Sequence, residues 1–476
     1  MKIKTNGIIN GLILTAIISA FTFNSIGYGN EPKREYFKNG QLKDESFFKD
    51  GKKDGLSKEY YENGQLKGEE VYKNGKEDGP SKWYYENGQA ESDEVYKNGE
   101  PEGLSKWFQK NGKLKVEEVY RDGKREGFSK EYYENGQLKT DAFYKDGKLE
   151  GLSKEYYENG HLEREGVFKN GELEGAVKFY YETGELKNEL FLKNGKAVGV
   201  TKEYYKSGKL KSEGVFRDGK LEGPVKEYYE NGQLKVEMTS KDGEPEGASK
   251  EYYANGKLKT EGAVKDRKPD GPFKTKYRNG KVRSEGAHKD GKLEGPLKEY
   301  SENGQLEAES VFKNGEKDGL SKEYYKSGQL KMERSFKDGK PIGQSRSYHE
   351  NGKLSTDLVF KDGELEGEQK FYFESGKLKA ERFFEKGKPE GQSKYYYENG
   401  KLARDATFKN GELEGVIKEY YENGQLRGEG VYKDGKPAGF YKEYHENGQL
   451  KVDGAQKNGK PEGQFKEYDE NGKLKP

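Results

Sequence analysis

The residues of this chain whose types could do chemistry are four histidines, a recurring serine and a large set of carboxylates. The histidines are His161, His288, His349 and His445, and the nearest pair, His288 and His349, is 61 residues apart. A metal ion needs several ligands around one point, and this spacing does not bring the imidazoles together. The sequence therefore predicts no metal site and no cofactor.

Serine recurs at one phase, as at Ser57, Ser81 and Ser105, and no histidine shares that phase. A catalytic nucleophile acts once, beside a base, so a periodic serine is better explained as a small polar strand residue. No pair of carboxylates is set apart in an apolar segment. The Asp-Gly and Asn-Gly dipeptides lack the alternating acidic ligands of calcium loops. We therefore predict that the chain is not an enzyme.

An internal repeat of 24 residues must position these side chains. Glycine occupies position 40, position 64 and every 24th position through Gly472, with further glycines eleven and fifteen residues later, as at Gly51 and Gly55. A fixed period of about 20 to 50 residues is typical of stacked repeat arrays, in which each unit contacts its neighbours. Positions within a repeat are numbered below from the first glycine, so that Gly64 is position 0.

Composition separates this chain from disordered and nucleic-acid-binding classes. Hydrophobic residues make up only 30% and charged residues 37% of the 476 positions, which alone would favour disorder. However, 37 Tyr, 23 Phe and 2 Trp recur periodically, and disordered chains are poor in aromatic residues. The 88 basic and 87 acidic residues alternate locally, so no basic stripe forms and we predict no binding of nucleic acid.

Residues 1–29 differ from the rest of the chain. Lys2 and Lys4 precede an apolar stretch from Gly7 to Phe23, and small residues follow at Ser25, Gly27 and Gly29. This is the layout of a secretory signal peptide, with an uncleaved membrane anchor as the alternative. We predict a signal peptide at 1–29 and a repeat array at 30–476. The protein is then exported to the cell surface, the periplasm or the medium, and contacts a membrane only if the segment is uncleaved.

Short aromatic segments bounded by Asn-Gly or Asp-Gly predict strands and hairpins. Position −4 is aromatic in nearly every copy, position +2 is usually Leu and position +8 is usually Phe or Tyr. Even spacing from +2 to +8 predicts that Leu66 and Tyr72 share one face of a strand. A three-residue loop, Glu62-Asn63-Gly64, would place Tyr60 opposite Leu66. We expect the other connection, Lys73 to Gly79, to be longer and to need two glycines.

Successive hairpins then continue one another. We predict an all-β fold: an elongated, single-layer antiparallel β-meander solenoid of about eighteen 24-residue hairpin repeats. Cross-strand aromatic pairs, each contributing roughly 0.2–1 kcal/mol, must stabilise such a layer because it buries no deep core.

Position −3 is tyrosine in many copies but becomes Ser301, His349 or His445 in others. Adjacent strand residues face opposite sides, so we expect the uniform row at −4 to be packed and the variable row at −3 to be more exposed. Exposed tyrosines suit contacts with protein or glycan. The predicted binding surface consists of Tyr61, Tyr85, Tyr133, Tyr157, Tyr205, Tyr229, Tyr253, Tyr325 and Tyr421. The alternative is that these rings only cover neighbouring Lys and Glu side chains.

The run from Phe216 to Gly223 and the later Tyr228-Tyr229-Glu230-Asn231-Gly232 resemble the MORN repeat, and more closely its bacterial variant. The resemblance extends over residues 31–476. It implies a twisted antiparallel sheet with a shallow groove, and it implies scaffolds that bind proteins or membranes. Similar bacterial chains are described as antitoxin-like, and arrays with signal peptides are thought to act at the cell surface.

Three functional hypotheses follow. The first is an exported, non-enzymatic scaffold that binds a macromolecular partner, a protein of the host or the envelope, along an extended surface. The second is a module that binds cell wall or carbohydrate, although such modules usually depend on Trp and only Trp83 and Trp107 occur. The third is an antitoxin-like or immunity-like partner of a toxin.

Residues 265–283 are the most divergent stretch of the array. Asp266-Arg267-Lys268 replaces the usual Asp-Gly-Lys, and Lys276 replaces the aromatic residue at −4. We hypothesise a weak point or a bend there, which preferential cleavage by limited proteolysis would reveal.

Overall fold

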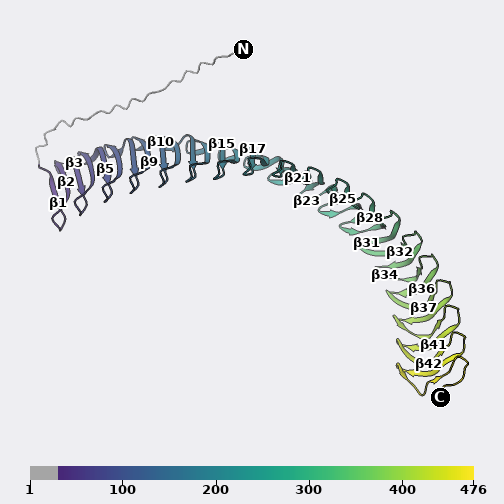
Figure 1. Ribbon diagram of the computed structural model, residues 1–476. Coiled ribbons are helices and arrows are strands. Elements are labelled where there is room, and N and C mark those ends of the chain that lie inside the picture. Colours follow the sequence, from purple (N-terminus) through teal and green to yellow (C-terminus); the bar gives the residue numbers. More distant parts are fainter. Residues whose placement is uncertain (1–30) are drawn as a thin grey trace, which may run out of the picture. The chain divides into compact units, whose positions relative to one another are not determined.

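The computed structural model describes residues 31–476, which fold into 45 β-strands joined by turns (Figure 1). Contacts between Cα atoms divide the chain into two units, one ending at Gly175 with Glu182–Gly184 added, the other comprising Ala176–Tyr181 and Glu185–Pro476. Each unit by itself is an antiparallel meander of hairpins, which confirms the predicted all-β repeat class. The predicted signal peptide lies outside the described residues. Within 31–476 there is no helix that could cross a membrane.

Each repeat supplies one strand from position +2 to position +9. These strands are β2 (Leu42–Lys49), β4 (Leu66–Lys73), β6 (Ala90–Lys97), β9 (Leu114–Arg121), β11 (Leu138–Lys145), β14 (Leu162–Lys169), β16 (Leu186–Lys193), β18 (Leu210–Arg217), β20 (Leu234–Lys241), β22 (Leu258–Lys265), β25 (Val282–Lys289), β28 (Leu306–Lys313), β31 (Leu330–Lys337), β33 (Leu354–Lys361), β36 (Leu378–Glu385), β38 (Leu402–Lys409), β41 (Leu426–Lys433) and β43 (Leu450–Lys457).

The other strand of each repeat leads into position −4 and is either continuous or broken by a bulge. The first strand of the array and the continuous ones are β1 (Lys33–Tyr36), β3 (Lys52–Tyr60), β5 (Lys76–Tyr84), β10 (Lys124–Tyr132), β15 (Glu172–Tyr180), β17 (Lys196–Tyr204), β19 (Lys220–Tyr228), β21 (Glu244–Tyr252), β32 (Lys340–Tyr348), β37 (Lys388–Tyr396) and β42 (Lys436–Tyr444). The broken ones are β7 (Glu100–Pro101) with β8 (Gly103–Phe108), β12 (Lys148–Leu149) with β13 (Gly151–Tyr156), β23 (Lys268–Pro269) with β24 (Gly271–Lys276), β26 (Lys292–Leu293) with β27 (Gly295–Tyr300), β29 (Glu316–Lys317) with β30 (Gly319–Tyr324), β34 (Glu364–Leu365) with β35 (Gly367–Tyr372), β39 (Glu412–Leu413) with β40 (Gly415–Tyr420), and β44 (Lys460–Pro461) with β45 (Lys466–Glu467).

The turn at the first glycine is the predicted three-residue loop. The Tyr61 amide donates to the Gln65 carbonyl over 2.8 Å, and Gly64, at φ 85°, donates its amide to the Tyr61 carbonyl. Tyr60 consequently lies opposite Leu66, as expected. Glycine is favoured at the last loop position because that residue must adopt the left-handed conformation.

The second connection is shorter than expected. Lys73 pairs with Lys76, so the loop is only Asn74-Gly75, and both residues have positive φ, 52° and 83°. That is a type I′ turn, whose twist matches that of the flanking strands. Gly79 belongs instead to a bulge, between the pairs of Tyr72 with Glu77 and of Glu70 with Ser81. The prediction of one long connection with two glycines was therefore wrong.

A second bulge, at Lys67, changes which side chains share a face of the sheet. Tyr60 pairs with Leu66 and Glu59 with Gly68, so Lys67 has no partner of its own in the ladder. A bulge of one residue changes the alternation of faces. Leu66 and Tyr72 therefore lie on opposite faces, not on one.

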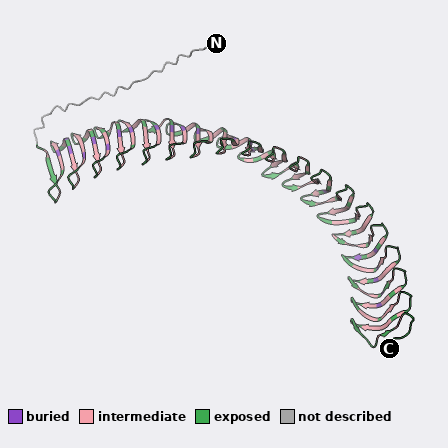
Figure 2. Ribbon diagram, in the orientation of Figure 1, coloured by how far each residue is buried: buried purple, intermediate pink, exposed green. Residues whose placement is uncertain are grey.

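The two faces of the sheet have different compositions. The face that carries Ser57, Glu70 and Tyr72 is called the serine face, and the face that carries Leu56 and Val71 is called the stripe face. Ser46, Ser105 and Ser393 on the serine face are completely buried. Few other side chains are buried, and they recur along the strands of each unit (Figure 2).

On the serine face, several pairs place a large side chain opposite a small one on the next strand, although Ser46 pairs with Ser57 and Gln369 with Arg382. Gly430 pairs with Tyr441, whereas Met238 pairs with Ser249. Single-layer packing leaves no second sheet to absorb a mismatch in volume, so each pair must fill its own space. This rule of complementary volumes links residues in neighbouring repeats.

The divergent stretch keeps its register. Lys265 pairs with Lys268 across a turn in which Asp266 and Arg267 both have positive φ, 49° and 65°. Arg267 thus occupies the left-handed position that glycine has elsewhere, and its guanidinium pairs with Glu244 at the surface. The proposed weakness of this stretch to proteases stays a prediction.

Replacing Arg267 by glycine is expected to stabilise this hairpin by about 0.5–1 kcal/mol. Relief of the left-handed conformation is worth roughly 1–2 kcal/mol, and the added chain entropy of glycine offsets about 0.5–1 kcal/mol of that. Slower amide hydrogen exchange in peptides covering 258–276 would show the gain. Arg267→Lys keeps the strain and serves as the control. Equal or faster exchange in the glycine variant would contradict the prediction.

Candidate functional site

The histidines do not form a shared site in the described chain. His349 and His445 place their Nε2 atoms 3.1 and 3.0 Å from the carbonyl oxygens of Tyr372 and Tyr468, one repeat further along. His288 stacks on Phe273, with ring centroids 4.5 Å apart. Among residues 31–476 no group of three or more His, Cys, Asp or Glu side chains is arranged to hold a metal ion.

The tyrosines at position −3 connect successive repeats. The hydroxyl of Tyr61 donates to the carbonyl of Tyr84 over 2.8 Å, and the same bond to the next repeat recurs at Tyr85, Tyr133, Tyr205, Tyr229, Tyr253, Tyr325 and Tyr421. Tyr157 holds the same position in its repeat. The imidazoles of His349 and His445 replace the phenol in this contact.

The expectation that the −3 row would be the more exposed one stays a prediction, because the tyrosines of both rows, apart from Tyr36, are half-buried. Tyr61 at −3 and Tyr60 at −4 are both only half-buried, and the −3 hydroxyls bond to main-chain carbonyls of the array itself. A role of these nine tyrosines in binding stays a prediction. Sequence reasoning missed this structural use because the acceptor carbonyl lies 23 residues further along the chain.

The exposed apolar surface lies elsewhere, at positions −8 and +7 of the stripe face. Among residues 31–476, every exposed large hydrophobic side chain apart from Tyr36 and Leu474 belongs to these two positions. We call this row the apolar stripe. Its exposed members are Leu56, Val95, Leu104, Phe128, Phe143, Leu152, Val167, Phe191, Val200, Val311, Leu320, Val359, Phe383, Val416 and Phe440.

The stripe is built by cross-strand pairs. Leu56 lies opposite Val71 and Phe128 opposite Phe143 in the antiparallel ladder. The signal was present in the sequence, since position −8 directly follows the third glycine and position +7 precedes the aromatic residue at +8. It was missed because the residue types vary among Leu, Val, Phe, Pro and Ala, and some repeats carry a polar residue there, such as Gln344, Glu368 or Thr407. Only the pairing shows that the two positions form one row.

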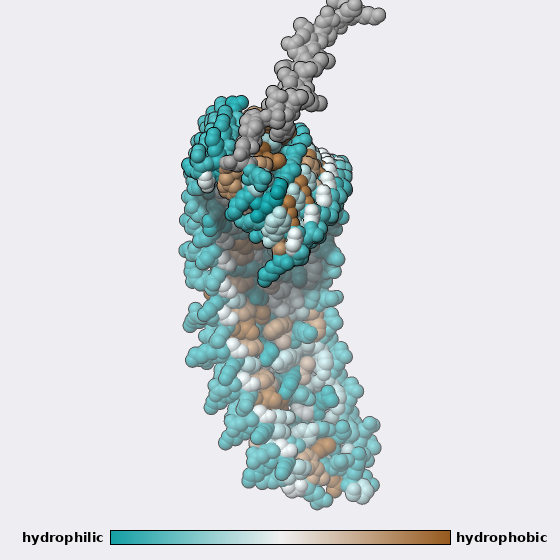
Figure 3. Space-filling view, turned by 90° about the vertical axis from the view of Figure 1, so that its left-hand side faces the viewer, coloured by the Kyte–Doolittle hydropathy of each residue, from teal (hydrophilic) through white to brown (hydrophobic). Residues whose placement is uncertain are grey.

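A line of alternating charges runs beside the stripe. Lysine at −6 lies opposite an acidic residue at +5, as in Lys58 and Glu69, whose Nζ and Oε2 atoms are 3.8 Å apart. The tyrosine at −4 adds a hydrogen bond to this line, as from the Tyr324 hydroxyl to Glu309 over 2.8 Å. Burial, together with that hydrogen bond, raises the pKa of Tyr324 to about 12. Hydrophobic residues gathered in a band between hydrophilic borders are visible in Figure 3.

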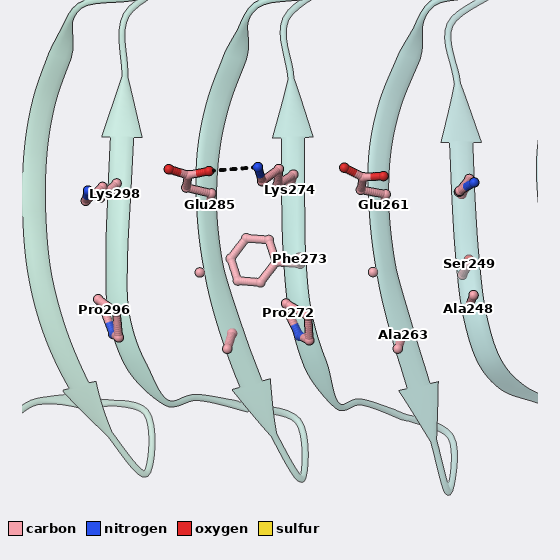
Figure 4. Close-up of a pocket in the computed structure, with 14 residues that line it drawn as sticks. Ala248, Ser249, Glu261, Ala263, Pro272, Phe273, Lys274, Glu285, Pro296 and Lys298 are labelled. Carbon is pink, nitrogen blue, oxygen red and sulfur yellow. Dashed lines mark ion pairs between the residues drawn. The ribbon is translucent and has the colours of Figure 1, made fainter.

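One segment of the stripe is hollowed, within the second unit. Between Val200 and Val311, positions −8 and +7 include Ala248, Ala263, Pro272, Ala287 and Pro296. These residues line a depression of about 720 Å³. Figure 4 shows the small apolar side chains on neighbouring strands, beside a row of lysines and glutamates that crosses the strands.

The hollow lies over strands that carry glycine on their other face. Gly262 and Gly286, both at +6, have no side chain, and the ring of Phe273 covers Gly286 on the serine face. A Cβ atom on Gly286 would come within 3.1 Å of that ring. We call the depression lined by the five alanine and proline positions of the stripe face the hollow. It overlaps the stretch 265–283 that the sequence marks as divergent, since Pro272 lies within that stretch and the other four positions flank it.

These features define a repeat protein whose single antiparallel sheet presents an exposed apolar row. The chain belongs to the family of MORN repeat variants, whose profile matches nineteen segments between residues 33 and 475. The matched segments are 33–50, 53–74, 77–98, 101–122, 125–146, 149–170, 173–194, 197–218, 221–242, 245–266, 269–290, 293–314, 317–338, 341–362, 365–386, 389–410, 413–434, 440–458 and 461–475. No curated protein matches the chain.

Solved structures give only weak similarities. A crystal structure of TcdB2–TccC3 is 12% identical, with a TM-score of 0.15, over 88% of this chain and 28% of that chain. The Photorhabdus luminescens Tc holotoxin pore gives 12% identity and a TM-score of 0.14, over 88% of this chain and 27% of that chain. This chain thus spans little more than a quarter of the length of those proteins. TM-scores this low support no argument about fold or function.

Proposed function

We propose that the protein is an exported, non-enzymatic repeat scaffold that binds a protein partner of the host or the envelope along the apolar stripe. The observation that supports this most is that, in the part of the chain that the structure describes, nearly all exposed large hydrophobic residues are confined to positions −8 and +7. Soluble proteins rarely expose contiguous apolar surface without a binding role. An apolar centre beside a charged border is also the usual anatomy of a protein interface.

The composition of the stripe favours a protein partner over a glycan. Val and Leu make up most of its exposed members, and its aromatic residues are all Phe, which cannot hydrogen-bond to sugar hydroxyls. The −3 tyrosines, which could have provided such hydroxyls, donate to carbonyls of the array. Many weak contacts along repeated positions would add up through multivalency.

Export rests on the sequence of residues 1–29. The basic start, the apolar stretch and the small residues that follow are typical of a signal peptide. N-terminal sequencing of the protein from fractionated cells should show a new N-terminus near Gly27 or Gly29. Recovery of the intact chain with Met1 from the cytosol would contradict export.

Charged substitutions in the stripe test the binding function. Leu56→Glu, Leu104→Glu and Leu152→Glu together should lower retention of the partner at least tenfold, a loss of about 1.4 kcal/mol or more, because each carboxylate must lose water in an apolar interface. The partner would first be captured in the cells that express the protein, with a photo-crosslinking amino acid that replaces Val200 in an otherwise wild-type chain.

The matched control adds the same charge elsewhere. Gln65→Glu, Gln89→Glu and Gln137→Glu lie in exposed turns at position +1, away from the stripe. These three changes should leave partner retention unchanged. Equal retention by the two triple variants would refute a role for the stripe.

A further inference from the structure

Both turns of the repeat contain Asn-Gly dipeptides, which can lose the side-chain amide of asparagine without an enzyme. The main-chain nitrogen of the glycine attacks the side-chain carbonyl carbon of the asparagine. A C–N bond forms and closes a succinimide ring, and ammonia leaves with the proton of the glycine nitrogen. Water then opens the ring to an aspartyl or an isoaspartyl residue. The reaction therefore depends on how firmly the fold holds the asparagine side chain and the glycine N–H.

The three-residue turn holds its asparagine, at position −1, by two side-chain hydrogen bonds. The side-chain amide of Asn87 donates to the carbonyl of Lys110 in the next repeat over 2.9 Å, and its Oδ1 atom accepts from the Gln89 main-chain amide over 3.1 Å. The same two bonds recur at Asn39, Asn135, Asn159, Asn231, Asn255, Asn279, Asn351, Asn399, Asn423 and Asn447. Aspartate occupies this position in no repeat, as expected because an ionised carboxylate cannot donate to a carbonyl.

The two-residue turn leaves its asparagine side chain, at position +10, without such bonds. The asparagines there whose side chains form no hydrogen bond within residues 31–476 are Asn74, Asn98, Asn170, Asn314, Asn410 and Asn458, and all six are exposed. The glycine that follows is engaged through its main chain, as where the Gly99 N–H donates to the Glu77 carbonyl over 2.7 Å. The amide that must leave is therefore free, although the attacking nitrogen is not.

Each turn must open locally before it reacts, because the glycine N–H is bonded in both. The Gly88 N–H donates to the Tyr85 carbonyl over 2.8 Å, so it is restrained like that of Gly99. At Asn98 this glycine bond is the only hydrogen bond within residues 31–476 that restrains the two reacting groups, whereas at Asn87 the two side-chain bonds must break as well. Two additional hydrogen bonds lower the population of the open, reactive turn by about tenfold or more.

Aspartate already occupies position +10 in ten other repeats. These residues are Asp50, Asp122, Asp146, Asp218, Asp242, Asp266, Asp290, Asp338, Asp362 and Asp434. Their φ angles lie between 46° and 54°, and those of the six asparagines lie between 52° and 54°. The main-chain amide of Asp122 donates to the Glu102 carboxylate over 2.9 Å, so a second acidic side chain beside the turn is tolerated. The aspartyl product consequently fits the turn that the asparagine occupied.

We propose that the six asparagines at +10 are sites of spontaneous deamidation in the folded protein, and that the fold protects the asparagines held at −1. Each conversion puts a carboxylate where a neutral amide was, so six conversions lower the formal net charge of +1 by six. The aspartyl product makes these repeats like the ten that carry aspartate, whereas the isoaspartyl product inserts an extra backbone carbon into a two-residue turn. The modification needs only water and is independent of the partner that the stripe binds.

The test follows Asn87 and Asn98, which belong to the same repeat but to different turns. The full chain is incubated in mildly alkaline buffer and digested with chymotrypsin, which cleaves after Tyr85, Tyr96 and Trp107 and so separates the two asparagines. Mass spectrometry then measures the mass gained when an amide becomes a carboxylate. Conversion at Asn98 should be at least about tenfold faster than at Asn87.

The unfolded chain in guanidinium chloride is the matched control, because both sites are then the same free dipeptide. Asn87 and Asn98 should react at similar rates there, and Asn87 should react faster than it does in the folded chain. Equal rates at the two sites in the folded chain would overturn the proposal. It is also overturned if the folded chain stays unmodified at Asn98 while the unfolded chain reacts. The same preference for Asn98 in the unfolded chain would overturn it too, because the fold would not be the cause.

Two variants measure how each turn accepts the product. Asn98→Asp should leave hydrogen exchange in peptides covering 86–107 unchanged, as expected for a residue that ten repeats carry. Asn87→Asp should speed exchange in the same peptides, because a carboxylate cannot donate to the Lys110 carbonyl. Faster exchange in Asn98→Asp than in Asn87→Asp would contradict the assignment of the two turns.

Discussion

Replacing Gly68 by valine is expected to destabilise the β4–β5 hairpin by about 1–3 kcal/mol, the usual cost of overpacking. Gly68 pairs with Trp83 on the serine face, and a Cβ atom on Gly68 would lie 2.7 Å from the indole ring. The ring cannot easily move, because its Nε1 atom donates to Ser81 and the Lys67 ammonium lies over its face. Hydrogen exchange in peptides covering 60–90 measures the local loss.

A second substitution should remove this penalty. Gly68→Val with Trp83→Glu recreates the pair that Val116 and Glu131 form at the equivalent positions. The double variant should therefore be more stable than the sum of the two single variants predicts, by about 1 kcal/mol or more, since contacting residues are coupled. Additive single effects would contradict the rule of complementary volumes.

The control introduces the same residue where space exists. Thr140 pairs with Glu155, so Thr140→Val at the same position of another repeat has no ring to meet. Its effect on local stability should stay within about 0.5 kcal/mol, as for most substitutions that touch no special feature. If Thr140→Val and Gly68→Val cost the same, the clash with Trp83 is not the cause.

Alkaline unfolding between pH 10 and 12 is the second large effect that we expect. Tyr132, Tyr204, Tyr324 and Tyr396 each have a pKa raised to about 12, by burial first and then by a hydrogen bond to a glutamate. An unfolded tyrosine has a pKa of about 10. Between these values the folded chain binds more protons than the unfolded chain, so stability falls as pH rises.

The contribution of these tyrosines is thus complete below pH 10 and lost as pH passes through about 12. Circular dichroism and tyrosinate absorbance should show ionisation and loss of strand structure together. Phenylalanine at all four positions should make the pH dependence shallower. Tyr36→Phe, which changes a 59% exposed residue of β1, is the control. Ionisation that is complete well before any loss of structure would contradict the prediction.

Much of the local structure could be predicted from the sequence. The spacing of Gly64 from Tyr60 and Leu66 was enough to predict the three-residue turn and the pair that closes it, because a hairpin loop of given length fixes the register beside it. The repeat family could also be predicted from the sequence, since it is defined by the sequence motif that each repeat contains. The second turn was mispredicted because Gly79 lies in a bulge and not in the turn. A bulge can be recognised only when the pairing of both strands is known.

The candidate surface needed the tertiary structure. From the sequence, Tyr61 is expected to be an exposed ring, and only the structure places the carbonyl of Tyr84 beside its hydroxyl. The bulge at Lys67 likewise places Leu66 on the face opposite Tyr72. The sequence alone determined the period, the strands, the turn at Gly64 and the repeat family, since these follow from local conformational preference. Only the assembled sheet decided which residues form the apolar stripe and where it is hollow. The face on which a side chain lies, and how exposed it is there, depend on neighbours a whole repeat away in the sequence.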